Sequence, residues 1–104
     1  MEVRFFDEKV KHFVGDLQMP TSAKVFRMFE LLDRFGHELG MPHSKNIGGG
    51  LYELRIRGIQ EVRLFYAFHK GVALLLHGFI KKSQRIPGKE MKIVRQKLDA
   101  LDKI

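Results

Sequence analysis

The sequence contains no cysteine among its 104 residues, and this absence removes several classes of protein. Disulfide-bonded domains, thiolate nucleophiles and cysteine-ligated zinc sites are excluded. No apolar run approaches the roughly 20 residues that a membrane-spanning helix needs, since the longest covers only residues 72–76. Residues 1–4 show no basic-then-apolar export signal. We therefore expect a cytoplasmic protein with no membrane partner.

The length and composition suit one compact domain. A chain of 104 residues that is 44% hydrophobic and has nine Phe can build one core, and too little would remain for a second. We predict a single domain over residues 1–104.

Acidic residues are scarce relative to basic ones. Nineteen Lys and Arg against twelve Asp and Glu leave a net charge of +7. Residues 80–104 hold eight basic and three acidic residues, which is +5 in the last quarter of the chain. This asymmetry predicts a polyanionic partner, or a tail that docks on an acidic protein.

The N-terminal half has the apolar spacing of two helices. A short strand over residues 3–6 precedes a helix that Asp7 would cap, with Val10, Phe13, Val14 and Leu17 on one face. Met19-Pro20 interrupts the pattern, and Thr21 or Ser22 would cap a second helix ending near Gly40. The apolar face of this second helix comprises Val25, Met28, Phe29, Leu32, Phe35 and Leu39.

The second half alternates like an antiparallel sheet. Residues 41–50 have the composition of a loop, and three strands follow at residues 51–57, 61–68 and 72–80, separated by hairpin-length turns. A last helix begins near Pro87. The fold class is therefore predicted to be α+β: an N-terminal strand and a helical hairpin packed on an antiparallel sheet, in the order β-α-α-β-β-β-α.

The period of two assigns each strand residue to a face. One face is apolar and includes Leu74, Leu76 and Tyr66, which we assign to packing under the helical hairpin. The other face is cationic, and its members are Glu53, Arg55, Arg57, Arg63, Phe65, His77, Phe79 and Lys81. A solvated sheet face is the ordinary interpretation, but four cations and one carboxylate favour a phosphate-bearing ligand. Phe65 and Phe79 would either stack unpaired bases or lie under the last helix.

Four linked motifs resemble a known family. GGLYELR (49–55), RLFY (63–66), LLHGFIKKSQ (75–84) and PGKE (87–90) are similar to segments of the RelE/ParE toxin superfamily, above all its phage-derived HigB-like branch. The resemblance covers nearly the whole chain and includes the order of its elements.

The resemblance implies the toxin of a type II toxin-antitoxin system. Such toxins are metal-independent endoribonucleases without cofactors, which cut mRNA in the ribosomal A site. The 2′-hydroxyl attacks the adjacent phosphorus, and a 2′,3′-cyclic phosphate and a 5′-hydroxyl result. A helix-turn-helix antitoxin holds the toxin inactive. The superfamily also contains ParE-type inhibitors of DNA gyrase, and a non-catalytic RNA-binding domain is a third interpretation.

The reaction needs a base, an acid and charge stabilisation at phosphorus. Arg55 and Arg63 match motif arginines and are the candidate phosphate clamps, because a guanidinium binds two phosphate oxygens at once. Lys81 and Lys82 match a Lys-Lys pair and would stabilise developing charge, or simply end a solvated strand. The remaining candidate RNA contacts are Arg57, Phe65, Phe79 and Arg85.

Glu53 and His77 are the candidate base and acid. Each has a structural alternative, because Glu53 would also orient Arg63 by pairing with it, and a lone His on a strand is commonly structural. The other histidines lack metal-ligand spacing, so no metal site is predicted.

Overall fold

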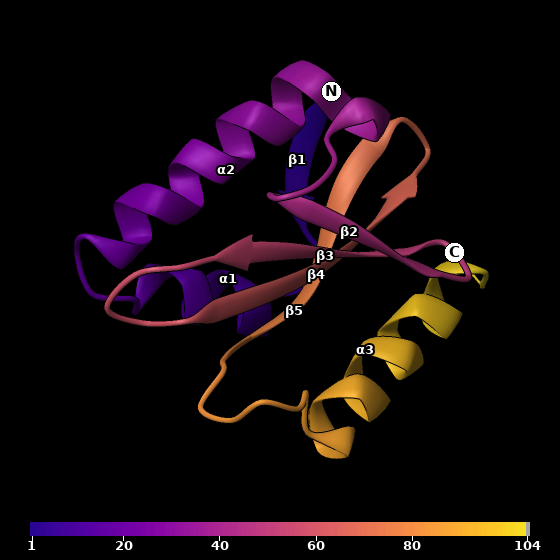
Figure 1. Cartoon of the computed structure of the whole chain (residues 1–104). Helices are drawn as coiled ribbons and strands as arrows, with labels where there is room; N and C mark the ends of the chain where they lie inside the picture. The colour runs from indigo at the N-terminus through magenta and orange to yellow at the C-terminus, as the bar shows by residue number, and fades with distance from the viewer. Residues whose placement is uncertain (104) are drawn as a thin grey trace.

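A computed structural model describes residues 1–103. Figure 1 shows the elements, which are β1 (Glu2–Phe5), α1 (Glu8–Gly15), α2 (Thr21–Phe35), the 3-10 turn η1 (Gly36–Glu38), β2 (Ser44–Gly48), β3 (Leu51–Ile56), β4 (Val62–His69), β5 (Val72–Ile80) and α3 (Gly88–Leu101). The predicted α+β class and order are confirmed, with β2 as an additional strand. No helix among the described residues has the length and apolar character needed to cross a membrane.

The five strands form one sheet in the order β1-β5-β4-β3-β2. The β3–β4 and β4–β5 pairs are antiparallel hairpins, as predicted, whereas β1 runs parallel to β5. The unpredicted strand β2 lies in the segment expected to be a loop, and it pairs antiparallel with β3. The sequence did not predict β2 because its residues are mostly Gly and polar. An edge strand needs few apolar residues when its main chain is paired.

Helices cover both faces of the sheet. Figure 1 shows α2 and α3 on opposite sides of it. Residues of α1 and α2, with Leu54, Leu64 and Tyr66 of the sheet, form the larger core. The smaller core lies between α3 and the other sheet face, and its buried members are Leu51, Phe65, Ala67, Leu76, Phe79, Val94 and Leu101.

A bulge in β5 changes which residues face which helix. Phe65 pairs with His77 but Tyr66 pairs with Leu75, so Leu76 is the extra residue on β5. A bulge puts two successive residues on roughly one side and reverses the alternation beyond it. The predicted placement of Leu74 and Leu76 under the helical hairpin is therefore wrong, since both belong to the core under α3 while Leu75 packs on the hairpin side.

The predicted helix ends are confirmed at the start of α1 but not at either end of α2. The Asp7 carboxylate accepts a hydrogen bond from the Val10 N–H at 3.0 Å and caps α1, as predicted. Helix α2 begins without a side-chain cap, because Thr21 is already its first residue and is buried. The same helix ends at Phe35 rather than near Gly40, since Gly36 adopts a φ of 54° that breaks the helix and that residues with a Cβ rarely adopt.

Lys97 joins three elements near the β5 bulge. Its Nζ donates to the Leu76 carbonyl at 2.8 Å and lies 3.0 Å from Asp7 Oδ2. It thereby connects α3 to the bulge and to the start of α1. Burial alone would raise the pKa of Asp7, but the Val10 hydrogen bond and the Lys97 ion pair together hold that pKa below its ordinary value.

Candidate RNA-binding cleft

A carboxylate between two arginines forms the centre of the cationic sheet face. Arg55 of β3 lies directly opposite Arg63 of β4, and Glu53 is two residues before Arg55 on the same side of β3. Two like charges placed opposite each other on neighbouring strands repel. The nearby Glu53 carboxylate relieves part of that repulsion.

The Glu53 carboxylate is much closer to Arg55 than to Arg63. Arg55 Nε donates to Glu53 Oε1 at 2.9 Å. Arg63 Nε is 3.9 Å from Glu53 Oε2, too far for a hydrogen bond, and Arg63 is held instead by Glu61 Oε2 at 3.1 Å. Glu53 Oε2 therefore accepts no hydrogen bond within the described residues, although the Glu53 side chain is only 2% exposed.

An unpartnered buried carboxylate oxygen is unusual because it costs free energy. Here it lies at a cleft of about 570 Å³ bordered by β2, β3, β4, the segment after β5 and the start of α3. The lining has five cations against one carboxylate, and comprises Lys45, Asn46, Ile47, Glu53, Arg55, Arg63, Lys81, Gln84, Arg85, Ile86 and Met91. The five cations suit a ligand that carries anionic oxygens, and Glu53 Oε2 becomes available to such a ligand once the side chains that cover it move.

A second hollow adjoins this cleft and continues its charge. It has a volume of about 740 Å³ and shares Arg63, Lys81 and Gln84 with the first. Arg57 and Lys82 also line it. The cationic surface therefore extends beyond the cleft along the end of β3 and the segment after β5, which gives a polyanion room to pass the central residues.

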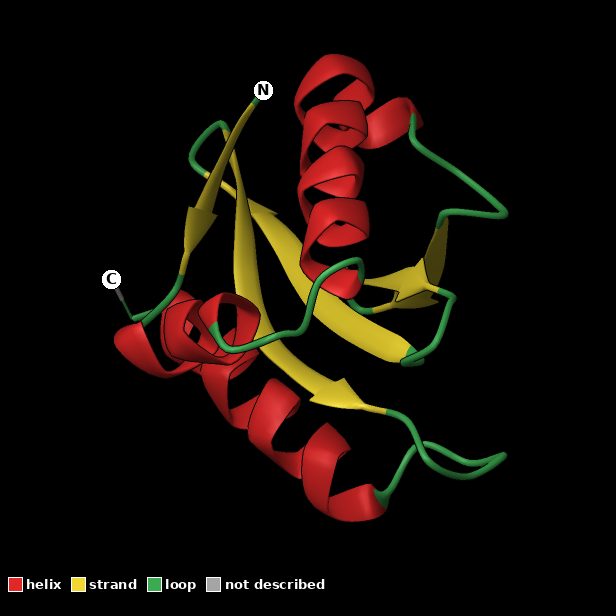
Figure 2. Ribbon diagram, turned by 90° about the vertical axis from the view of Figure 1, so that its left-hand side faces the viewer, coloured by secondary structure: helices red, strands yellow, loops and turns green. Residues whose placement is uncertain are grey.

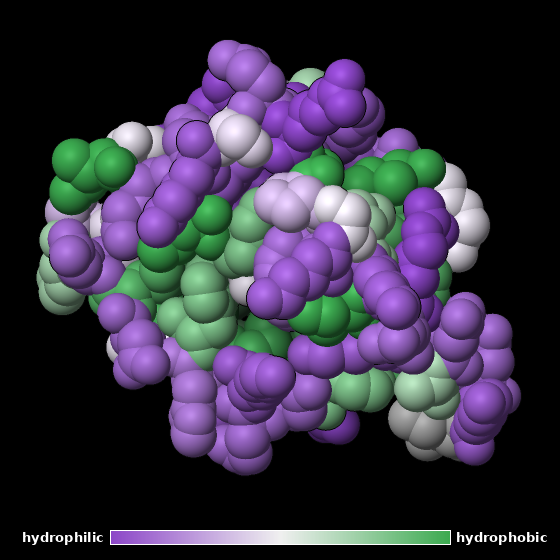
Figure 3. Space-filling view, turned by 90° about the horizontal axis from the view of Figure 1, so that it is seen from below, coloured by the Kyte–Doolittle hydropathy of each residue, from purple (hydrophilic) through white to green (hydrophobic). Residues whose placement is uncertain are grey.

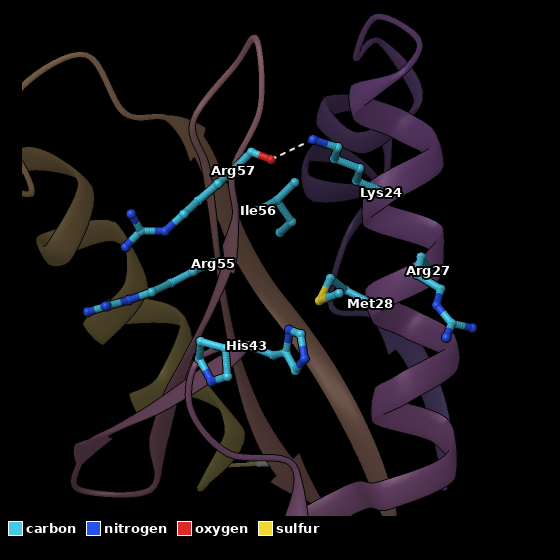
Figure 4. Close-up of a pocket in the computed structure, with 8 residues that line it drawn as sticks. Lys24, Arg27, Met28, His43, Arg55, Ile56 and Arg57 are labelled. Carbon is cyan, nitrogen blue, oxygen red and sulfur yellow. Dashed lines mark hydrogen bonds between the residues drawn. The ribbon is translucent and has the colours of Figure 1, made fainter.

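The structure brings most of the predicted site residues together. Glu53, Arg55, Arg63, Lys81 and Arg85 line the cleft, and Arg57 and Lys82 line the adjoining hollow. Figure 4 shows a different pocket, of about 260 Å³, which lies between α2 and β3. In that view the Arg55 and Arg57 side chains extend away from Met28 of α2, so both guanidiniums serve the opposite, cationic face.

His77 lies apart from the central residues. Its Nε2 is 3.2 Å from Glu90 Oε2 of α3, and both side chains are less than one-fifth exposed. His77 is not among the residues that line either hollow. The geometry favours its structural alternative, a tie between β5 and the first turn of α3.

Phe65 and Phe79 are not available to stack on bases. Phe65 is fully buried and Phe79 is 8% exposed, and their rings stack on each other with centroids 6.1 Å apart. Helix α3 covers them, so the prediction that they bind RNA is wrong and the alternative placement under the last helix is correct. The apolar side of α3 needs such partners, and these two rings are the largest on this sheet face.

Sequence reasoning missed three lining residues because it treated residues 41–50 as a loop. Lys45, Asn46 and Ile47 belong to β2 and form one wall of the cleft. A glycine turn directly before a strong strand could have indicated a hairpin partner upstream, since such turns join antiparallel strands. Gln84 was missed for another reason: nothing in the pattern distinguishes it within its loop.

The rest of the surface gives no competing metal site. Among residues 1–103, no three His, Asp or Glu side chains are grouped so as to hold a metal ion. Figure 3 shows the molecule from below, with hydrophilic side chains over most of that face and apolar ones in separate small areas.

The comparison with known proteins assigns a family. Residues 12–99 match the family described as "Phage derived protein Gp49-like (DUF891)", and a search of curated proteins found no match. The matched segment includes β2 to β5 and most of α3, and hence every residue that lines the cleft. On this match over most of its length, the chain belongs to the phage-derived Gp49-like family, which is associated with RelE-like toxins.

Proposed function

We propose that the protein is the toxin of a type II toxin-antitoxin system, of the HigB-like kind, and that it cuts mRNA in the cationic cleft. The observation that carries the proposal is the buried, unpartnered Glu53 Oε2 beside two arginines at the cleft. Phosphate oxygens suit Arg55 and Arg63, since a guanidinium can bind two of them together. Once bound RNA displaces the side chains that cover it, the unpartnered carboxylate oxygen suits a hydroxyl, and the ribose 2′-hydroxyl distinguishes RNA from DNA.

In the proposed reaction, side chains that line the cleft accept and donate each proton. Glu53 takes the proton of the 2′-hydroxyl as that oxygen bonds to the adjacent phosphorus. Arg55 and Arg63 stabilise the negative charge on the phosphorane oxygens. The bond from phosphorus to the 5′-oxygen then breaks, and Lys81 gives that oxygen a proton. A 2′,3′-cyclic phosphate and a 5′-hydroxyl remain.

The flanking cations would hold the RNA on either side of the broken bond. Arg57 and Lys82 extend the charge in one direction, and Lys45 and Arg85 border the cleft itself. We propose the translating ribosome as the place where the message is presented, and a helix-turn-helix antitoxin as the inhibitor. His77 has no proton-transfer role in this proposal, because Glu90 occupies its Nε2.

Cleavage in growing bacteria tests the proposal. Expression of the wild-type chain should stop growth and leave message fragments with 5′-hydroxyl and cyclic phosphate ends. Arg55→Ala or Lys81→Ala should lower the cleavage rate about 100-fold or more, as loss of one charge-stabilising donor does in other enzymes. Arg34→Ala is the matched control, because Arg34 is an exposed arginine on α2 outside the cleft.

Two results would contradict cleavage. DNA damage with intact messages would instead support a ParE-like inhibitor of gyrase. Tight RNA binding without turnover would support a binding domain. A wild-type rate in Arg55→Ala would show that the cleft is not the active site, even if messages are cut.

A further inference from the structure

The two edges of the sheet differ in how they are protected. Strand β2 forms one edge, and a register shift between Asn46 and Gly48 bends it, which is a usual protection against edge pairing. Strand β1 forms the other edge and pairs with β5 without interruption over all four of its residues. Figure 2 shows β1 at the outside of the sheet, with no other strand of the described chain beyond it.

The outer side of β1 has free main-chain groups. The Phe6 N–H donates to the Leu75 carbonyl at 2.8 Å, so Phe6 and the alternate residues before it face β5. The N–H and C=O groups of Val3 and Phe5 therefore point outward. Neither residue has a hydrogen-bond partner there within residues 1–103. An extended main chain is the group that matches such a row of donors and acceptors.

The side chains of β1 are complementary to a second copy of themselves. Glu2 and Arg4 share one side of the strand, are 53% and 63% exposed, and pair with each other, with Arg4 Nη2 donating to Glu2 Oε2 at 3.0 Å, so pairing with a second copy would exchange this contact for two between the strands. If two β1 strands pair antiparallel about Val3, Glu2 lies directly opposite Arg4 of the partner subunit, and the reverse pair follows by symmetry. Opposite charges in that position stabilise a strand pair. An edge with charges of one sign would repel its copy.

An apolar groove lies beside this edge. Phe5, Phe26 and Phe29 line a hollow of about 570 Å³ between β1 and α2, which Val3 and the carboxylates of Glu2, Glu30 and Asp33 also border. Phe26 is 53% exposed although its ring lies edge-on to Phe29, with centroids 5.8 Å apart. A two-fold axis through Val3, perpendicular to the sheet, brings the same groove of each copy together on one face. Dimerisation would then bury the Phe26 rings.

We infer that the β1 edge is a dimerisation surface, at which two copies pair antiparallel through Val3 and join their two five-stranded sheets into one. This inference does not depend on the proposed function. The cationic cleft is formed at the other end of the sheet, by β2, β3 and β4. A dimer of this kind therefore leaves both clefts open.

Charge reversal tests the pairing directly. Sedimentation equilibrium of the full chain should show a concentration-dependent dimer. Arg4→Glu places like charges opposite each other in the dimer, and so does Glu2→Arg, so the dissociation constant of each variant should rise at least about tenfold. An equimolar mixture of the two variants should recover the dimer, because each restores the opposite charges that the other lacks.

Controls separate dimer loss from unfolding. Both positions are exposed, so thermal melts of the variants should stay close to that of the wild type. Lys11→Glu makes the same charge change as Arg4→Glu at an exposed site on α1 and should leave the dimer intact. A wild type that stays monomeric at all concentrations would overturn the inference. So would charge variants that dimerise alone, or a mixture that does not recover the dimer.

Discussion

The two faces of the sheet carry different kinds of residue because they have different amounts of cover. The face under α1 and α2 is mainly apolar in its buried part, with Leu54 and Leu64 at its centre and one buried polar contact, the 2.6 Å hydrogen bond between the Tyr66 and Ser44 hydroxyls. The face under α3 is apolar only where that helix reaches, around Phe65 and Phe79. Beyond the helix, the same strands carry Glu53, Arg55 and Arg63. The comparison teaches that the cleft exists where the second helical layer stops.

The apolar face should be the less tolerant of an added side chain. A Cβ at Gly78 would lie 2.4 Å from Leu64 Cδ2 and 2.7 Å from Phe13 Cε2, inside the packed layer below α1. Although valine favours strands, we expect Gly78→Val to lower the free energy of unfolding by about 3 kcal/mol or more. Urea denaturation measures this, with Gly15→Ala as control because that position is open. Equal stability of Gly78→Val and wild type would show that this layer is not closely packed.

On the sheet face under α3, which carries both apolar and charged residues, we expect the removal of a charge to lower stability. Glu53→Gln removes the charge between the two arginines, and Arg63→Met removes one of the arginines, so each should cost about 1–3 kcal/mol. The double variant should cost less than the sum by about 1 kcal/mol or more, since each single change leaves a buried charge that the other removes. Strict additivity in urea denaturation would mean that the 3.9 Å Arg63–Glu53 contact contributes nothing.

The smallest effect is expected at Asp7, which ties the two faces together through Lys97. Its lowered pKa means that the ionised form stabilises the fold, fully at neutral pH and progressively less as acid protonates it. Asp7→Asn keeps a capping oxygen but should lower stability by about 1 kcal/mol at pH 7. This difference should shrink as the pH falls below about 4. A difference that grows on acidification would contradict the assigned sign.

Much of the fold could be predicted from periodicity alone. The spacing of Val10 and Val14, and of Val25 and Leu32, gave both helices of the apolar face, and alternation placed Arg55 and Arg63 together. Strand β2 could not be found in this way, because an edge strand is held by main-chain bonds to β3 that leave little trace in its composition.

The sequence predicted which residues share a sheet face, but not which of them a distant helix would cover or contact. Alternation placed Phe65 and Phe79 correctly on the cationic face, but it contained no information on how far α3 would extend over that face. It also put His77 on the correct side without revealing Glu90, which approaches from a different element. Neighbours within a strand pair follow from local pattern, whereas neighbours brought by a distant helix do not.

The single extra residue in β5 makes this strand two half-strands that are out of phase with each other. Before Leu76, odd-numbered positions face α1 and α2, and after it they face α3. Deleting Leu76 would restore one continuous alternation and leave every other residue of β5 on its present face, whereas deleting a residue elsewhere in the strand would shift part of it onto the wrong face. Sequence searches for this fold that assume one continuous alternation along β5 would therefore misjudge half of the strand, so they should allow one phase slip at its centre.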